Sequence, residues 1–153
     1  MKKILLCSLM AFLFIQVGSA QWSIGARLGG ASGISLKSYS RTGSTHFEII
    51  SAFNFDDEFD DKGYSLTLLG EKFGAFTEDK KLGALLGIGE TMVFADDFYL
   101  GASGILGFDW RIGQRIGLQV DWLPTWIFVN DSYFSPVNVA FTARWMFGAR
   151  RSS

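Results

Sequence analysis

The sequence is poor in the residues that most often carry cross-links, metal sites or catalysis. Its only cysteine is Cys7, and it contains 2 prolines and a single histidine among 153 residues. Beyond the N-terminal segment, the chain therefore offers neither a disulfide framework nor a Cys/His zinc set. It also contains no glycine-rich phosphate loop or dinucleotide fingerprint at a strand-to-helix junction. We expect no cofactor.

The sequence also lacks a large excess of charge of either sign. The 14 basic and 15 acidic residues give a formal net charge of −1, and basic residues are adjacent only in pairs such as Arg150-Arg151. A protein that binds nucleic acid needs a basic patch or stripe to contact phosphates. The sequence therefore predicts no nucleic-acid partner.

Long apolar runs are limited to the N-terminus. A basic start, Met1-Lys2-Lys3, precedes an apolar run from Ile4 to Ile15 and the small residues Gly18-Ser19-Ala20. This order is typical of a secretory signal peptide, and the run is shorter than the roughly 20 residues of a membrane-spanning helix. We predict that residues 1–20 are a cleaved signal peptide and that the mature chain contains no transmembrane helix.

Glycine and aromatic residues are plentiful, with 18 glycines and an aromatic fraction of 16 %. From residue 21 onward, apolar and polar residues alternate with period two, which indicates β-strands. Turn-rich breaks separate eight such runs, at 22–29, 33–40, 45–55, 64–76, 82–94, 98–112, 115–128 and 137–147. Pro124 predicts a local bulge in the seventh run. We therefore predict an all-β chain, an eight-stranded antiparallel up-and-down barrel at 21–147 with a short tail at 148–153.

The charged residues indicate which strand face is inside. If the apolar face points outward, the inward set collects four bases and four acids: Arg27, Lys37, Glu48, Glu71, Asp109, Arg111, Asp121 and Arg144. A neutral set of paired ions suits the narrow, side-chain-filled lumen of an eight-stranded transmembrane barrel. Two positions, Lys72 and Glu90, share the parity of the apolar face. The alternatives are a soluble β-sandwich and a secreted soluble barrel that binds a small ligand in an apolar lumen.

A signal peptide, amphipathic strands and a last strand ending Arg144-Trp145-Met146-Phe147 resemble small outer-membrane barrels of the OmpA/OmpX type. The runs at 24–29 (IGARLG) and 65–72 (SLTLLGEK) are similar to small barrels of the Bacteroidetes group. The resemblance implies a location in the outer membrane, with outer-membrane lipids and the barrel-assembly machinery as partners. It also implies that Trp145 and Phe147 belong to the terminal assembly signal, although six residues follow Phe147 here. Closure leaves no strand edge to pair, so we expect a monomer.

Two groups could carry chemistry. Asp56, Asp57, Glu58, Asp60 and Asp61 place five carboxylates in one predicted outward loop, which could attract a divalent cation or serve as a solvated loop. The only histidine, His46, has the parity of Glu48, and a histidine–carboxylate pair could serve a lipid-modifying enzyme. No serine nucleophile is specified beside it. The leading hypothesis is therefore a non-enzymatic outer-membrane barrel with an envelope-structural or surface-interaction role.

Overall fold

The computed structural model describes residues 20–40, 44–54 and 63–147. Its strands are β1 (Ala20–Gly29), β2 (Ala31–Ser40), β3 (Thr45–Asn54), β4 (Tyr64–Ala75), β5 (Leu82–Phe94), β6 (Phe98–Ile112), β7 (Ile116–Trp122), β8 (Thr125–Val129), β9 (Tyr133–Ser135) and β10 (Val139–Phe147). In this part of the chain, no helix has the length and apolar character to cross a membrane. Residues 1–19 of the predicted signal peptide and the predicted tail lie outside the described residues, whereas Ala20 is the first residue of β1.

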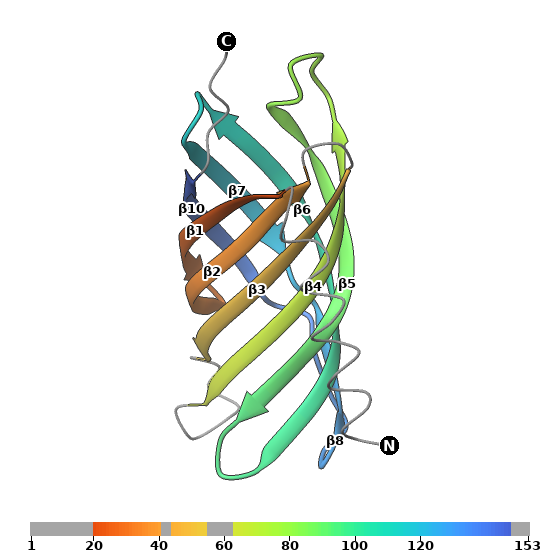
Figure 1. The fold of residues 1–153 in the computed structure, drawn as a ribbon. Helices are drawn as coiled ribbons and strands as arrows, with labels where there is room; N and C mark the ends of the chain where they lie inside the picture. The colour runs from red at the N-terminus through yellow and green to blue at the C-terminus, as the bar shows by residue number, and fades with distance from the viewer. Residues whose placement is uncertain (1–19, 41–43, 55–62, 148–153) are drawn as a thin grey trace.

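The strands close into one antiparallel barrel (Figure 1). Strands β1 to β6 each pair with the next strand along the chain, and β10 pairs back onto β1, from Trp22 opposite Phe147 to Gly29 opposite Ala140. Strands β7 and β8 together occupy the place of one strand beside β6, and β9 and β10 pair with them in turn. This arrangement confirms the predicted eight-stranded barrel.

The seventh strand is interrupted where the sequence predicts a bulge. Pro124 lies between β7 and β8, and it has no N–H to donate to a neighbouring strand. Its carbonyl still accepts a hydrogen bond of 3.0 Å from the N–H of Gly104, and the Leu123 N–H donates to the carbonyl of Asn138 at 2.8 Å. Backbone hydrogen bonds to the strands on both sides therefore continue across the break. The eighth strand is split in the same way around Pro136, so that β9 precedes the predicted start at residue 137.

Tight turns join the strands at one end of the barrel, which we call the turn end (top in Figure 1). Gly113, with a φ of 68°, supplies the left-handed residue of the β6–β7 turn. In the β4–β5 turn, the N–H of Lys80 donates to the carbonyl of Thr77 at 3.0 Å. The opposite end, here the loop end, carries the connections after β1, β3, β5 and β8. The predicted outward loop with Asp56 to Asp61 lies between β3 and β4, outside the described residues.

Apolar side chains cover the outside of the barrel and polar ones fill much of the inside. Along β10, exposed and buried residues alternate at every position from Val139 to Phe147. In β1, Arg27 is fully buried whereas its neighbour Leu28 is 65 % exposed. Soluble proteins have the reverse arrangement, with apolar residues inside. The outward-facing apolar parity inferred from the sequence is therefore the one observed.

Candidate functional site in the barrel interior

Seven of the eight predicted lumen charges form one connected group with a neutral residue, Gln119. We call this set the lumen ion cluster: Arg27, Lys37, Glu48, Glu71, Asp109, Gln119, Asp121 and Arg144. All eight side chains are buried. They come from β1, β2, β3, β4, β6, β7 and β10, so the cluster ties together nearly the whole circumference of the barrel.

Lys37 is the hub of the cluster. Its Nζ lies 2.6 Å from Glu71 Oε2, and 3.5–3.6 Å from carboxylate oxygens of Asp109 and Glu48. It also donates a hydrogen bond of 2.9 Å to Gln119 Oε1. Because a desolvated charge is tolerated only when it is paired and hydrogen-bonded, three carboxylates around one ammonium need further donors.

Those donors come from the other side of the cluster. Arg144 Nη2 lies 2.6 Å from Glu48 Oε1 and donates to Gln119 Oε1 at 2.7 Å. Gln119 Nε2 donates to Asp121 Oδ2 at 2.8 Å, and Asp121 pairs with both terminal nitrogens of Arg27 at 2.7 Å. Gln119 therefore links the two arginine pairs, and three bases face four acids in the cluster.

The eighth predicted charge, Arg111, lies apart from these ion pairs. Its guanidinium carbon is 4.5 Å from the Tyr39 ring centroid and 5.5 Å from that of Phe73. His46 lies against the same two rings, at centroid distances of 4.9 Å and 5.7 Å. The structure thus places the single histidine in a buried aromatic stack, where its Nδ1 has no hydrogen-bond partner among the described residues.

Charge alone does not predict three neutral members of this interior. Gln119 joins the two halves of the cluster, Tyr39 donates to Asp109 Oδ2 at 3.1 Å, and Ser35 donates to Glu48 Oε1 at 2.6 Å. The Ser35 hydroxyl also accepts from Arg144. Parity could have found these residues, because each shares the strand face of a charged neighbour two residues away.

The other part of the interior contains apolar side chains and hydroxyl groups. A buried apolar layer includes Ile50, Leu69, Leu85, Ile105 and Leu123. Nearer the loop end, the hydroxyls of four strands form a chain: Thr67 to Thr91 at 2.8 Å, Thr91 to Ser103 at 2.5 Å, and Ser103 to Thr125 at 2.8 Å. We call these four residues the hydroxyl chain.

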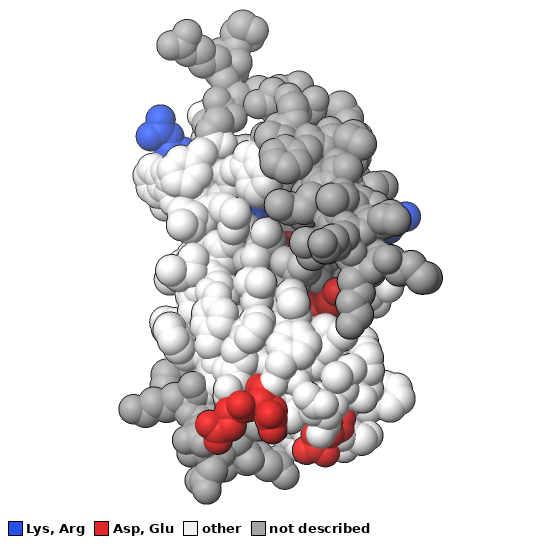
Figure 2. All heavy atoms as spheres, turned by 60° about the horizontal axis from the view of Figure 1, so that its bottom comes forward, with Lys and Arg blue, Asp and Glu red and all other residues white. Residues whose placement is uncertain are grey.

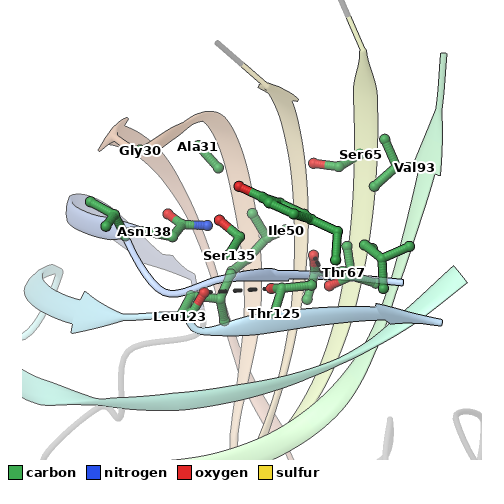
Figure 3. Close-up of a pocket in the computed structure, with 14 residues that line it drawn as sticks. Gly30, Ala31, Ile50, Ser65, Thr67, Val93, Leu123, Thr125, Ser135 and Asn138 are labelled. Carbon is green, nitrogen blue, oxygen red and sulfur yellow. Dashed lines mark hydrogen bonds between the residues drawn. The ribbon is translucent and has the colours of Figure 1, made fainter. Parts of the chain in front are cut away.

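A small pocket lies beside the hydroxyl chain (Figure 3). Thr67, Thr125, Ser135 and Asn138 contribute polar groups to its lining, together with apolar residues such as Ile50. Its volume is about 60 Å³. Pockets that enclose drug-sized ligands typically reach roughly 300 Å³ or more. This space therefore fits a few water molecules but not an organic ligand of ordinary size.

Of the remaining predicted sites, only the two aromatic residues of the assembly signal are among the described residues. Trp145 and Phe147 are half-exposed on β10 and face outward. The predicted cation loop, with Asp56 to Asp61, lies outside the described residues. Within the described residues, no group of three or more His, Cys, Asp or Glu could hold a metal ion.

Charges on the outer surface are concentrated at the ends of the barrel. Asp96, Asp97 and Asp131 are exposed at the loop end, and Figure 2 shows acidic side chains gathered there beside a largely uncharged wall. Two charges depart from this pattern, because Lys72 and Glu90 are exposed on the outward faces of β4 and β5. Glu90 is opposite Leu68 and Ala102, and no ion pair among the described residues includes it.

Comparisons with known proteins show a shared fold. No protein-family model matches the sequence, and no curated protein matches it. The N-terminal β-barrel domain of Pseudomonas aeruginosa OprF is similar over 84 % of this chain and 96 % of that chain, with a TM-score of 0.59 and 9 % identity. A de novo designed transmembrane β-barrel is similar over 86 % and 99 %, with a TM-score of 0.56 and 11 % identity. The chain therefore has the fold of small transmembrane β-barrels.

Proposed function

We propose that this protein is an integral outer-membrane β-barrel, non-enzymatic and closed to diffusion, that contributes to envelope structure or surface interaction. One observation carries the proposal: the barrel has apolar side chains outside and a connected ion cluster inside. Leu28, Ile34 and Ile88 are 57–78 % exposed, whereas Arg27 and Lys37 are fully buried. Only a hydrocarbon environment makes this inverted arrangement favourable.

Strand length supports insertion in a bilayer. Strands β1, β2 and β3 have 10 residues each, and β4 and β5 have 12 and 13. A tilted strand needs roughly 9–11 residues to span a bilayer core. The fold shared with the OprF barrel domain agrees with this location, and the N-terminal sequence pattern predicts export by a signal peptide.

The filled interior supports a structural role over transport or catalysis. Side chains of the lumen ion cluster and the apolar layer occupy the cross-section, and the pocket of about 60 Å³ is too small for the ligand of a soluble carrier. His46 is packed between the rings of Tyr39 and Phe73, and its Nδ1 has no hydrogen-bond partner among the described residues. Within the part of the chain that the structure describes, neither alternative function has a supporting site.

The test combines cell fractionation with a heat-modifiability gel and conductance in planar bilayers. We expect the mature chain to sediment with outer membranes, to migrate differently before and after boiling, and to give no steady conductance. Recovery as a soluble protein without detergent would overturn the membrane assignment. A steady open-channel current from the folded barrel would contradict the closed lumen. A lipid-acylation change that depends on His46 would replace the structural role with an enzymatic one.

A further inference from the structure

A shallow apolar groove, widely open to its surroundings, crosses the outer wall of the barrel over β2, β1, β10 and β7. Its outward-facing lining comprises Ile24, Ala26, Ile34, Ile116, Ala143 and Trp145, and its volume is about 510 Å³. Ala26 and Ala143 are opposite each other in the β1–β10 pair, so that two small side chains form the floor. Larger side chains stand on both sides, because Ile34 is opposite Ala26 in β2, and Ile116 is opposite Trp145 in β7.

The groove runs from the turn end toward the middle of the wall. Ile116 is the first residue of β7 at the turn end, whereas Ile34 is the fourth residue of β2 counted from the loop end. In Figure 1, β7, β10 and β1 lie next to one another along this part of the wall. A linear apolar chain that entered at the turn end could therefore follow the groove into the hydrocarbon region.

A positive charge stands at the entrance of the groove. The guanidinium carbon of Arg115, in the β6–β7 turn, lies 5.9 Å from the Trp145 ring centroid. The backbone holds this residue in place, since the Met146 N–H donates to the Arg115 carbonyl at 2.8 Å. Arg115 is exposed, and none of the ion pairs between described residues includes it. The N–H groups of an arginine guanidinium lie in one plane and can donate two hydrogen bonds to a phosphate group.

We propose that this groove binds an anionic phospholipid of the leaflet at the turn end, with one acyl chain over Ala26 and Ala143 and the phosphate on Arg115. The inference rests on the proposed membrane location and adds a specific lipid partner to it. Apolar surface matches the acyl chain, and the exposed guanidinium of Arg115 matches the headgroup. Trp145 joins the two parts, because an indole suits the boundary between headgroups and hydrocarbon.

The experiment measures lipid retention by native mass spectrometry. The full barrel, purified in detergent and first shown to be heat-modifiable, is incubated with equal amounts of phosphatidylglycerol and phosphatidylcholine that carry the same acyl chains. One basic residue near a membrane surface contributes about fivefold in preference for an anionic lipid. We therefore expect the one-to-one phosphatidylglycerol adduct to exceed the phosphatidylcholine adduct about fivefold.

Two variants separate the headgroup contact from the acyl contact. Arg115→Gln should bring the ratio of the two adducts close to one, while Lys80→Gln, in another turn at the same end, should leave it unchanged. Ala143→Leu fills the floor and should reduce both adducts, while Ala102→Leu, on the outward face of β6, should reduce neither.

Other outcomes overturn the inference without affecting the proposed function. Equal adducts for the unmodified barrel, or a loss with Lys80→Gln equal to that with Arg115→Gln, would show that the lipid preference does not depend on this site. A dimer that Ala143→Leu dissociates would show that a second copy of the chain covers the groove. Failure of the unmodified chain to shift on heating would instead contradict the proposed membrane barrel itself.

Discussion

Arg27 and Asp121 form a bidentate ion pair inside the barrel, with Arg27 Nη1 and Nη2 each 2.7 Å from a different oxygen of the carboxylate. The two residues are on β1 and β7, which do not pair with each other; β10 lies between them. Both side chains are fully buried. The contact therefore links strands through the interior as well as through the wall.

Replacing one partner of this pair should destabilise the barrel strongly. Asp121→Asn keeps the size of the side chain but leaves Arg27 charged and unpaired, which typically costs about 3–5 kcal/mol in a buried site. Urea unfolding in lipid vesicles, followed by tryptophan fluorescence, gives the free energy of unfolding. The double variant Arg27→Met/Asp121→Leu is the control and should recover most of the loss. A change below about 0.5 kcal/mol for Asp121→Asn, the range of ordinary surface substitutions, would contradict the prediction.

Lys37 should be still less replaceable, because it neutralises three carboxylates at once. Lys37→Met retains an unbranched side chain but leaves Glu71, Glu48 and Asp109 with less compensation. We expect a loss of at least about 3 kcal/mol in the same unfolding measurement, or no heat-modifiable band at all. Lys72→Met is the matched control, since Lys72 is exposed on the outer wall. Equal stability of the two variants would show that the interior charges are not a connected cluster.

The sequence predicts the wall of the barrel better than the connections within its interior. A period of two assigns each residue to one face, and a shift of one residue would move Arg27 and Leu28 to the wrong sides. Burial of one face therefore makes the strand faces readable from the sequence alone. The same period says nothing about depth along the barrel axis. For this reason the sequence groups Arg111 with the other lumen charges, although its guanidinium lies over the rings of Tyr39 and Phe73.

The neutral residues of the interior cannot be predicted from the sequence for a different reason. Gln119 has no charge to be balanced, and its role depends on lying between Asp121 and Arg144. That position depends on the register between β7 and β10 and on the pairing of β10 with β1. Neither can be predicted from a single sequence. The hydroxyl chain has the same origin, because its residues come from four strands that only the closed barrel brings together.

Glu90 is an ionisable group on the wall that should face lipid. It is exposed on β5 between outward-facing Ile88 and Met92, and Met92 is less exposed than either Ile88 or Glu90. Carboxylates on the lipid face of a barrel are destabilising, although less than the 2–4 kcal/mol found for basic residues at mid-depth. We expect Glu90→Leu to raise the free energy of unfolding in vesicles by about 1 kcal/mol.

A control for Glu90 is available at the turn end. Glu78 is exposed in the β4–β5 turn, outside the strands, so Glu78→Leu should leave the stability in vesicles nearly unchanged. If Glu90→Leu lowered the stability instead, the carboxylate would have a partner in the membrane. That result would identify the outer face of β5 as a contact surface.

The hydroxyl chain allows a test of interior hydrogen bonds with almost no change in shape. The Thr91 hydroxyl contacts both Thr67 at 2.8 Å and Ser103 at 2.5 Å, and Thr91→Val replaces that hydroxyl by a methyl group. Since a lost hydrogen bond leaves a buried partner unsatisfied, we expect a loss of about 1–3 kcal/mol in the free energy of unfolding.

Thr142 supplies the matched control for that test. Its side chain is also fully buried, but its hydroxyl has no hydrogen-bond partner among the described residues. Thr142→Val should therefore be neutral or stabilising, because it removes an unsatisfied polar group at nearly constant volume. The same vesicle-unfolding measurement compares the two variants directly. Equal losses for both would mean that volume and shape, and not the hydroxyl chain, determine the stability of this part of the interior.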